Sequence, residues 1–223
     1  MGGISMKVKV LIFDMDGTLF DSRQLLSQAI ENTLQYAVEQ KMYDDEGWTE
    51  KDRVGVIGQP YHQAFRELLP QASEQVINDL EPVLDRFILR EVNNGKGGLF
   101  PGVKETLSDL SVQGYELYVA SNGNAEYVPA ALEREGLTSL FKGVFSVQQY
   151  QAGNKVELVR TILQKAGKDA IMIGDRSSDI EAGKENQLVT IGCRFGYGDD
   201  KELAGSDKAV DHFKELTQVL TEG

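Results

Sequence analysis

The sequence contains very little cysteine and histidine. Its 223 residues include one cysteine, Cys193, and two histidines, His62 and His212. A single cysteine excludes an internal disulfide framework and suits a reducing compartment, so we expect a cytoplasmic protein in which Cys193 is a small core residue. Because neither histidine belongs to a His-x-x-x-His pattern and no Cys-x-x-Cys pair occurs, a zinc site is not expected.

The sequence also lacks long apolar runs and an excess of positive charge. No run approaches the length of a membrane span, and no apolar signal-peptide core is present near the N-terminus. The formal charge is −12. Because phosphate contacts need a basic face, we expect neither a nucleic acid nor a membrane as partner. Residues Met1–Ser5 precede a second methionine and are either a cloning scar or an alternative start.

Two common catalytic motifs are missing, but a pair of carboxylates stands out. No Walker A loop and no Gly-x-Ser-x-Gly elbow occurs. The apolar run 8–12 predicts a buried strand, and Asp14 and Asp16 follow it directly. Since strand side chains alternate, both are expected on one side, where like charges persist only with a cation or a shared proton. Thr18 and Leu19 stand where an EF-hand loop needs its next ligand and its glycine, which excludes that loop.

Short apolar runs alternate with amphipathic segments in the second half of the chain. This alternation predicts a parallel sheet with helices on both faces. The expected strands are 115–120, 143–146, 170–173 and 188–191, and the expected helices are 103–113, 126–135, 156–166, 178–185 and a last helix capped by Asp211.

The stretch from Asp21 to about Gly98 has no clear strand and keeps a helical period. We therefore expect an α/β protein: a Rossmann-like parallel sheet core with an inserted all-helical cap domain. The core is expected to span residues 1–20 and 97–223, and the cap residues 21–96. A helical insert next to the acidic pair suggests a lid that excludes water.

Polar residues follow two further strands of the predicted sheet. Ser121 and Asn122 come after one of these strands, and Asp175 and Asp179 come after another. Open α/β sheets bind ligands at the carboxyl ends of their strands, so these groups are expected to meet the acidic pair. Taken singly, Asp175 also fits a helix N-cap and Ser121-Asn122-Gly123 a plain turn. Four carboxylates around one pocket need a cation, and oxygen ligands favour Mg²⁺ over zinc.

With these motifs in order, the chain resembles the haloacid dehalogenase (HAD) superfamily, in the phosphoglycolate-phosphatase-like branch with a helical cap. The segment from Asp14 to Thr18 matches the first motif of that family and Ser121-Asn122 the second. Lys155 matches the third, ahead of Lys142, and the segment from Gly174 to Asp179 matches the fourth. Arg176 replaces a residue that is often small, and it either forms a surface salt bridge or touches substrate.

The resemblance implies a hydrolase that transfers a phosphoryl group to an aspartate. It makes Asp14 the nucleophile and Asp16 the general acid and base. It implies that Ser121, Asn122 and Lys155 bind the phosphate. The implied Mg²⁺ ligands are Asp14, Asp16 through its backbone carbonyl, Asp175 and Asp179.

The resemblance also implies a substrate class and leaves alternatives open. We expect a phosphatase for a small phosphorylated metabolite, acting as a monomer or homodimer. An acid at Asp16 disfavours cleavage of carbon–halogen bonds. A phosphomutase similar to β-phosphoglucomutase is the nearest alternative, and a catalytically idle binding or regulatory module is another. The cap loop offers Gln59, His62 and Arg66 as contacts of the leaving group, although Pro60 also fits the first turn of an ordinary helix.

Overall fold

The fold is built on a parallel sheet of six strands. The computed structural model describes residues 8–44 and 46–221, and Met1–Ser5 lie outside the described residues. The strand order is β5-β4-β1-β6-β7-β8, and every neighbouring pair is parallel. The strands are β1 (Val10–Phe13), β4 (Glu116–Ser121), β5 (Phe141–Ser146), β6 (Ala170–Gly174), β7 (Val189–Cys193) and β8 (Lys208–Val210). The five predicted strands are confirmed, and β8 is an addition.

The chain order reverses at β1, which lies between β4 and β6. From β1 the sheet grows first through β4 to β5 and then on the other side through β6 to β8. In a doubly wound sheet, such a reversal opens a crevice at the carboxyl ends of the central strands. The polar residues that follow β1, β4 and β6 therefore meet at one place.

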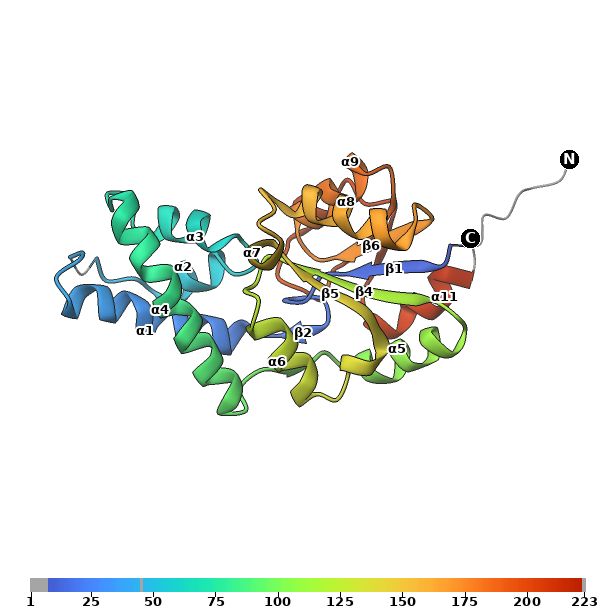
Figure 1. The fold of residues 1–223 in the computed structure, drawn as a ribbon, viewed down its shortest axis with the longest axis horizontal. Coiled ribbons are helices and arrows are strands. Elements are labelled where there is room, and N and C mark those ends of the chain that lie inside the picture. The colour runs from blue at the N-terminus through green and yellow to red at the C-terminus, as the bar shows by residue number, and fades with distance from the viewer. Residues whose placement is uncertain (1–7, 45, 222–223) are drawn as a thin grey trace, which may run out of the picture.

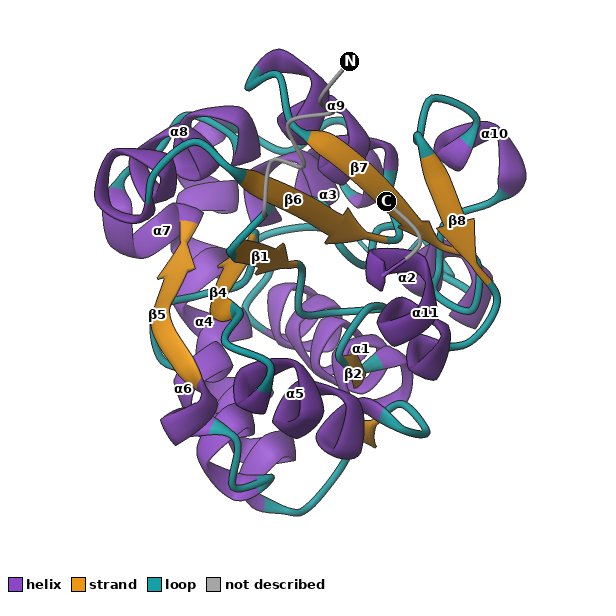
Figure 2. Ribbon diagram, turned by 90° about the vertical axis from the view of Figure 1, so that its right-hand side faces the viewer, coloured by secondary structure: helices purple, strands orange, loops and turns teal. Residues whose placement is uncertain are grey.

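Helices cover both faces of the sheet, as Figure 2 shows. In β1, Val10 and Ile12 pack on the side of α8 and α9, whereas Leu11 and Phe13 face the side of α5 and α6. This alternation follows from the period of two in a strand. The core helices are α5 (Val103–Val112), α6 (Tyr127–Arg134), α7 (Val147–Tyr150), α8 (Lys155–Ala166), α9 (Ser177–Glu185), α10 (Asp200–Leu203) and α11 (Leu216–Thr221).

The predicted last helix is shorter than expected and has a different start. A single 3-10 turn (Phe213–Glu215) precedes α11, and His212 rather than Asp211 stands at its N-cap position. The prediction that Asp211 caps this helix was wrong. The residues before Asp211 pair in β8, and the carboxylate of Asp211 lies near Arg194 instead. The expectation for Cys193 is confirmed, since it is fully buried in β7.

Four helices are inserted between the two short strands β2 (Phe20–Asp21) and β3 (Gly98–Leu99). They gather at one end of the molecule, beyond the carboxyl ends of the sheet's strands (Figure 1). The inserted helices are α1 (Arg23–Glu39), α2 (Glu50–Gly55), α3 (Tyr61–Leu68) and α4 (Glu74–Asn93). Because β2 and β3 pair antiparallel, the chain enters and leaves this region side by side. The pair is a correction to the expectation of no strand there.

The return to the core needs glycine at Gly97. Its φ is +74°, and an added Cβ would lie 2.5 Å from Cε1 of Phe20. A side chain at this position would therefore separate the two crossings. The placement of the helices supports the division into a core (1–20 and 97–223) and a cap (21–96), which we propose as the domain organisation.

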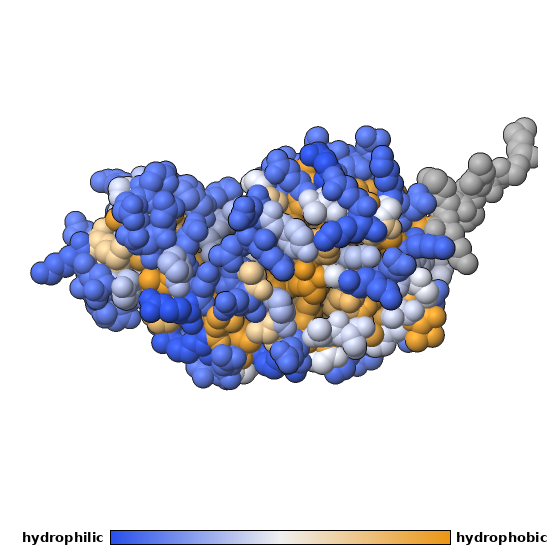
Figure 3. Space-filling model, in the orientation of Figure 1, coloured by the Kyte–Doolittle hydropathy of each residue, from blue (hydrophilic) through white to orange (hydrophobic). Residues whose placement is uncertain are grey.

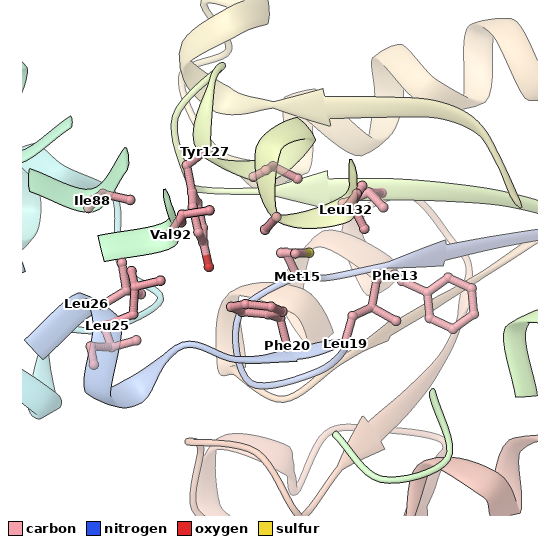
Figure 4. Packing of buried hydrophobic residues seen from close by; sticks show 14 of the residues in the cluster. Phe13, Met15, Leu19, Phe20, Leu25, Leu26, Ile88, Val92, Tyr127 and Leu132 are labelled. Carbon is pink, nitrogen blue, oxygen red and sulfur yellow. The ribbon is translucent and has the colours of Figure 1, made fainter. Parts of the chain in front are cut away.

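One continuous apolar core joins the inserted helices to the sheet. Figure 4 shows Phe20, Leu26 and Tyr127 between Phe13 of the sheet and Ile88 of α4. On the face drawn in Figure 3, hydrophilic residues cover most of the surface, and apolar atoms show chiefly along the lower middle. Among the described helices, none has both the length and the apolar character needed to cross a bilayer.

Candidate active site

Three buried carboxylates lie together at the carboxyl ends of β1 and β6. Asp14 follows β1 directly, Asp175 follows β6, and Asp179 is in the first turn of α9. One oxygen from each carboxylate lies within 4.8 Å of the other two. All three residues are at most 3% exposed. The structure therefore brings together three of the four predicted acidic residues through their side chains.

Lys155 is the cation that touches this carboxylate cluster. Its Nζ lies 2.5 Å from Oδ1 of Asp14 and 2.6 Å from Oδ1 of Asp179. Lys155 opens α8, where the side chain of Asn154 caps the helix by accepting from the backbone N–H of Glu157. Lys142, the alternative for the same role, is exposed on β5.

Asp175 is fixed by two hydrogen bonds from other parts of the chain. The Thr18 hydroxyl donates to its Oδ1 at 3.0 Å, and the backbone N–H of Tyr197 donates to its Oδ2 at 2.7 Å. Asp175 is not the N-cap of α9, because Arg176 occupies that position. Gly17 allows this approach: its φ is +90°, and an added Cβ would lie 2.2 Å from Oδ2 of Asp175.

The cluster holds more negative charge than Lys155 alone can balance. Burial raises the pKa of Asp14 well above its usual range, repulsion from Asp179 raises it further, and the charge of Lys155 opposes both. Burial and then Asp179 raise the pKa of Asp175 to about 7. For Lys155, burial lowers the pKa, but Asp14 and Asp179 outweigh burial and raise it. Such shifts mark a site that gains from a further cation.

The donor set fits a hard divalent cation such as Mg²⁺. The three residues offer only oxygen, which suits Mg²⁺ better than zinc or copper. Although both oxygens of Asp175 accept hydrogen bonds, each carboxylate oxygen has a second lone pair. The side chain of Asp16 is not one of the three carboxylates, so its predicted contribution through the backbone carbonyl stays a prediction.

Asp16 has a different set of partners from Asp14. The Tyr127 hydroxyl donates to its Oδ1 at 2.5 Å. Burial raises the pKa of Asp16, and hydrogen bonds from Ser22 and Tyr127 oppose that rise. Tyr127 is itself fully buried in α6, and burial together with the charge of Asp16 raises its pKa, so it stays a donor. Both Asp14 and Asp16 line one small cavity of about 20 Å³.

The second predicted motif forms another wall of this cavity. Ser121, Asn122 and Gly123 line it after β4. Oγ of Ser121 accepts from the backbone N–H of Gly123 at 2.9 Å, which is a turn of the kind expected for these residues. Because Oγ is the acceptor in that bond, the hydroxyl proton of Ser121 is available to another group.

The inserted helices close the cavity from the opposite side. Leu26, Gly58, Gln59 and Tyr61 complete its lining. Nδ2 of Asn122 donates to the carbonyl of Gly58 at 2.9 Å, so the two sides are in direct contact. At about 20 Å³ the cavity holds about one water molecule, so this is a closed arrangement.

Of the three predicted cap residues, the structure places one at the cavity. Gln59 lines it, whereas His62 and Arg66 do not belong to its lining. Nε2 of His62 lies 2.8 Å from Oε2 of Glu74, and Arg66 pairs with the other oxygen of the same carboxylate. Both residues therefore stabilise the packing of α3 on α4 in this arrangement.

Sequence reasoning missed the tyrosines of the site. They come from three separate segments of the chain. Tyr61 lines the cavity, Tyr127 contacts Asp16, and Tyr197 contacts Asp175. Tyr197 acts through its backbone N–H, for which a side-chain motif gives no signal. For Tyr127 the only available signal was its position six residues after Ser121, at the start of a helix predicted to follow the second motif.

Comparison with known proteins gives a consistent family. The family model described as "Haloacid dehalogenase-like hydrolase" matches residues 11–193. Phosphoglycolate phosphatase from Agrobacterium fabrum is 32% identical, and the match covers 95% of this chain and 91% of that protein. Pyrophosphatase PpaX from Listeria innocua serovar 6a is 28% identical, over 89% of this chain and 88% of that protein.

Solved structures show the same fold at lower identity. A haloacid dehalogenase-like family protein from Streptococcus pneumoniae superposes with a TM-score of 0.78 at 21% identity, covering 96% of this chain and 98% of that chain. CbbY from Rhodobacter sphaeroides, solved in complex with phosphate, gives a TM-score of 0.79 at 20% identity, covering 94% and 96%.

Proposed function

Because this chain belongs to the haloacid dehalogenase-like hydrolase family, we propose that it is a Mg²⁺-dependent phosphatase. Its substrate is a small phosphorylated metabolite, such as a phosphoglycolate-like compound or a sugar phosphate. The names of the phosphoglycolate phosphatase and pyrophosphatase relatives support phosphate-ester or anhydride hydrolysis. The reaction proceeds through an aspartyl-phosphate on Asp14.

The observation that carries this proposal is that two neighbouring carboxylates have different contacts. Asp14 belongs to the carboxylate cluster and touches Lys155, whereas Asp16 touches the Tyr127 phenol and has its side chain outside that cluster. Both line the same cavity. A cation in the cluster lowers the pKa of Asp14 much more than that of Asp16, which separates a nucleophile from a proton carrier.

In the first step, an ionised oxygen of Asp14 attacks phosphorus and the bond from phosphorus to the leaving oxygen breaks. Asp16 gives its proton to the leaving alcohol as that bond breaks. Because Tyr127 donates to Oδ1 of Asp16, the transferable proton is carried by Oδ2. In the second step Asp16 takes a proton from water, which attacks phosphorus and releases Asp14 and inorganic phosphate.

The phosphoryl group is held by residues from the end of β4 and the start of α8. Lys155, the Ser121 hydroxyl and the backbone amide of Asn122 bind its oxygens and stabilise the charge of the transition state. Asp14, Asp175 and Asp179, together with the Asp16 carbonyl, would hold Mg²⁺. When bound, the ion neutralises the repulsion between an anionic nucleophile and an anionic phosphate.

Release of phosphate from p-nitrophenyl phosphate tests the proposal. We expect activity that EDTA abolishes and added Mg²⁺ restores, and we expect Asp14→Asn to abolish turnover and trapping of phosphate on the protein. Activity that persists in Asp14→Asn would exclude Asp14 as nucleophile. Sugar phosphates should be tested for isomerisation in parallel, because a phosphomutase would convert them without net release of phosphate.

A further inference from the structure

Three buried oxygen atoms at the active-site cavity have no hydrogen-bond partner among the described residues: the Tyr61 hydroxyl and two amide oxygens. The amide oxygens, which can only accept, are Oε1 of Gln59, from the cap, and Oδ1 of Asn122, after β4. Both residues line the cavity that also holds Asp14 and Asp16. A buried acceptor without a donor is unfavourable, so the two oxygens are suited to receive donors from a bound molecule.

The orientation of each amide follows from its other contact. Nε2 of Gln59 donates to a carboxylate oxygen of Glu67 at 3.2 Å, and Nδ2 of Asn122 donates to the Gly58 carbonyl at 2.9 Å. Turning either amide would set its oxygen against an acceptor, which is repulsive. The free atoms are therefore oxygens, which accept hydrogen bonds and repel anions.

The cavity lining offers no positive charge to a second anionic group on the substrate. Among the described residues that line the cavity, none is Arg, Lys or His. Two basic residues of the neighbouring helix, His62 and Arg66, contact Glu74, and Arg176 is paired with Glu202. A carboxylate or second phosphate on the leaving group would thus be buried beside acceptors without a counter-charge, which is strongly unfavourable.

The cavity also has an apolar extension into the cap. A second small cavity of about 30 Å³ shares Leu26, Gly58, Gln59 and Tyr61 with the first and continues among apolar side chains. When the cap moves to admit substrate, the leaving group therefore meets carbon atoms, two amide oxygens and the neutral Tyr61 hydroxyl. That surface suits carbon chains with hydroxyl groups better than ions.

On the basis of the proposed phosphatase function, we infer that the leaving group is an uncharged alcohol with a further hydroxyl, as in polyol and sugar phosphates. The hydroxyl donates to the free oxygen of Gln59 or Asn122. Relatives named for phosphoglycolate or pyrophosphate share the family, but this wall lacks the cation that a second anionic group needs.

Three matched two-carbon esters test the inference on the unmodified protein with Mg²⁺. They are 2-hydroxyethyl phosphate, which carries a donor, ethyl phosphate, which lacks one, and phosphoglycolate, which carries a carboxylate. From phosphate release, we expect kcat/KM for 2-hydroxyethyl phosphate to exceed that for ethyl phosphate by about tenfold, the effect of one hydrogen bond to a buried acceptor. Phosphoglycolate should be the poorest of the three. A higher kcat/KM for phosphoglycolate than for 2-hydroxyethyl phosphate would overturn the inference.

Variants of Gln59 assign the effect to this wall. Gln59→Met keeps the length and removes one of the two acceptors, so it should lower the ratio of kcat/KM for 2-hydroxyethyl phosphate to that for ethyl phosphate. Gln59→Arg should raise kcat/KM for phosphoglycolate. Gln63→Met, which alters an exposed glutamine of the following helix α3, is the control and should change neither. Equal losses on both esters in Gln59→Met would contradict a role in selecting the hydroxyl.

The outcome separates this inference from the proposed function. Asp14-dependent hydrolysis of p-nitrophenyl phosphate with a preference for phosphoglycolate would refute only the substrate class. Lack of hydrolysis of every ester, p-nitrophenyl phosphate included, would refute the phosphatase itself and the substrate class with it.

Discussion

Replacement of Asp175 by asparagine tests whether the carboxylate cluster carries an unbalanced charge when no metal is bound. Asp175 is fully buried, and burial together with Asp179 raises its pKa from 3.8 to about 7. Asparagine has the same shape and can keep both hydrogen bonds: its oxygen accepts from the Tyr197 N–H, and its amide donates to the Thr18 hydroxyl. The substitution therefore removes a charge with little change in packing.

The expected magnitude follows from the pKa of Asp175. A carboxyl group that titrates at 3.8 when unfolded and at about 7 when folded binds its proton more tightly in the folded protein. Its contribution to stability is fully present below pH 3.8 and is lost as the pH rises through 7. That loss amounts to at most about 4 kcal/mol at 1.36 kcal/mol per pKa unit. Asparagine does not titrate and avoids this loss.

Urea unfolding in EDTA between pH 4 and pH 8 measures the effect. We expect the stability of Asp175→Asn relative to the parent to improve by about 2–4 kcal/mol across that range. At pH 8, Mg²⁺ at 100 times its dissociation constant should stabilise the parent by about 2.7 kcal/mol and the variant much less. Asp207→Asn is the control: because Lys184 holds the pKa of Asp207 below its usual value, its contribution changes only below about pH 4, and its difference from the parent should stay nearly constant between pH 4 and pH 8.

Two results would refute this reasoning. A stability difference between Asp175→Asn and the parent that does not change with pH would show that Asp175 is not destabilised by its surroundings. Equal stabilisation of both proteins by Mg²⁺ would show that the ion binds elsewhere or without Asp175.

Further substitutions test single contacts of the site. Lys155→Met should lower kcat/KM for p-nitrophenyl phosphate by at least about a hundredfold, because a buried charged contact is worth about 3 kcal/mol; activity near that of the parent would mean that the third motif is misplaced. Tyr127→Phe should lower kcat/KM about tenfold for alkyl phosphates, because their leaving groups need the proton of Asp16. The loss for p-nitrophenyl phosphate should be much smaller. Equal losses on both substrates would argue against a role of Tyr127 in positioning Asp16. Gly17→Ala should lower the melting temperature and the Mg²⁺ response. Its control is Gly95→Ala, at a similar φ of +79° with nothing within 4 Å of the added Cβ, which should cost only about 1–2 kcal/mol of stability. Equal costs would mean that backbone strain, and not the close approach to Asp175, causes the loss.

The sheet and the strand ends could be predicted because they depend on local patterns. Each central strand is a short apolar run bounded by turn residues, and Val10–Phe13 alternates between two buried faces as a strand must. Parallel strands place their carboxyl ends at one edge, so Asp14, Ser121 and Asp175 were expected together before any distance was known.

The elements that sequence reasoning missed depend on contacts between distant segments. β2 and β3 are each two residues long and exist only because the two crossings to the cap pair with each other. The bond from Tyr127 to Asp16 spans 111 positions and depends on how α6 docks against the sheet. Nothing in the local sequence of either residue specifies that distance.

The cap residues illustrate a second limit, which is competition between partners. Gln59, His62 and Arg66 lie within one short segment and are all polar, so no local pattern separates them. Glu74, at the start of α4, supplies a carboxylate that contacts both His62 and Arg66. Gln59 is left at the cavity with an oxygen that no described residue satisfies.

Arg176, for which the sequence left two roles open, is part of the contact that closes the cap. Its Nε lies 2.9 Å from Glu202, and its Nη1 donates to the Ile57 carbonyl at 2.9 Å. Asn122 donates to the next carbonyl, that of Gly58. A cavity of about 20 Å³ is too small for a phosphate ester, so we expect both bonds to break when substrate enters. Since such bonds contribute about 1 kcal/mol each, they can hold the cap over the reaction without preventing it from opening in every turnover.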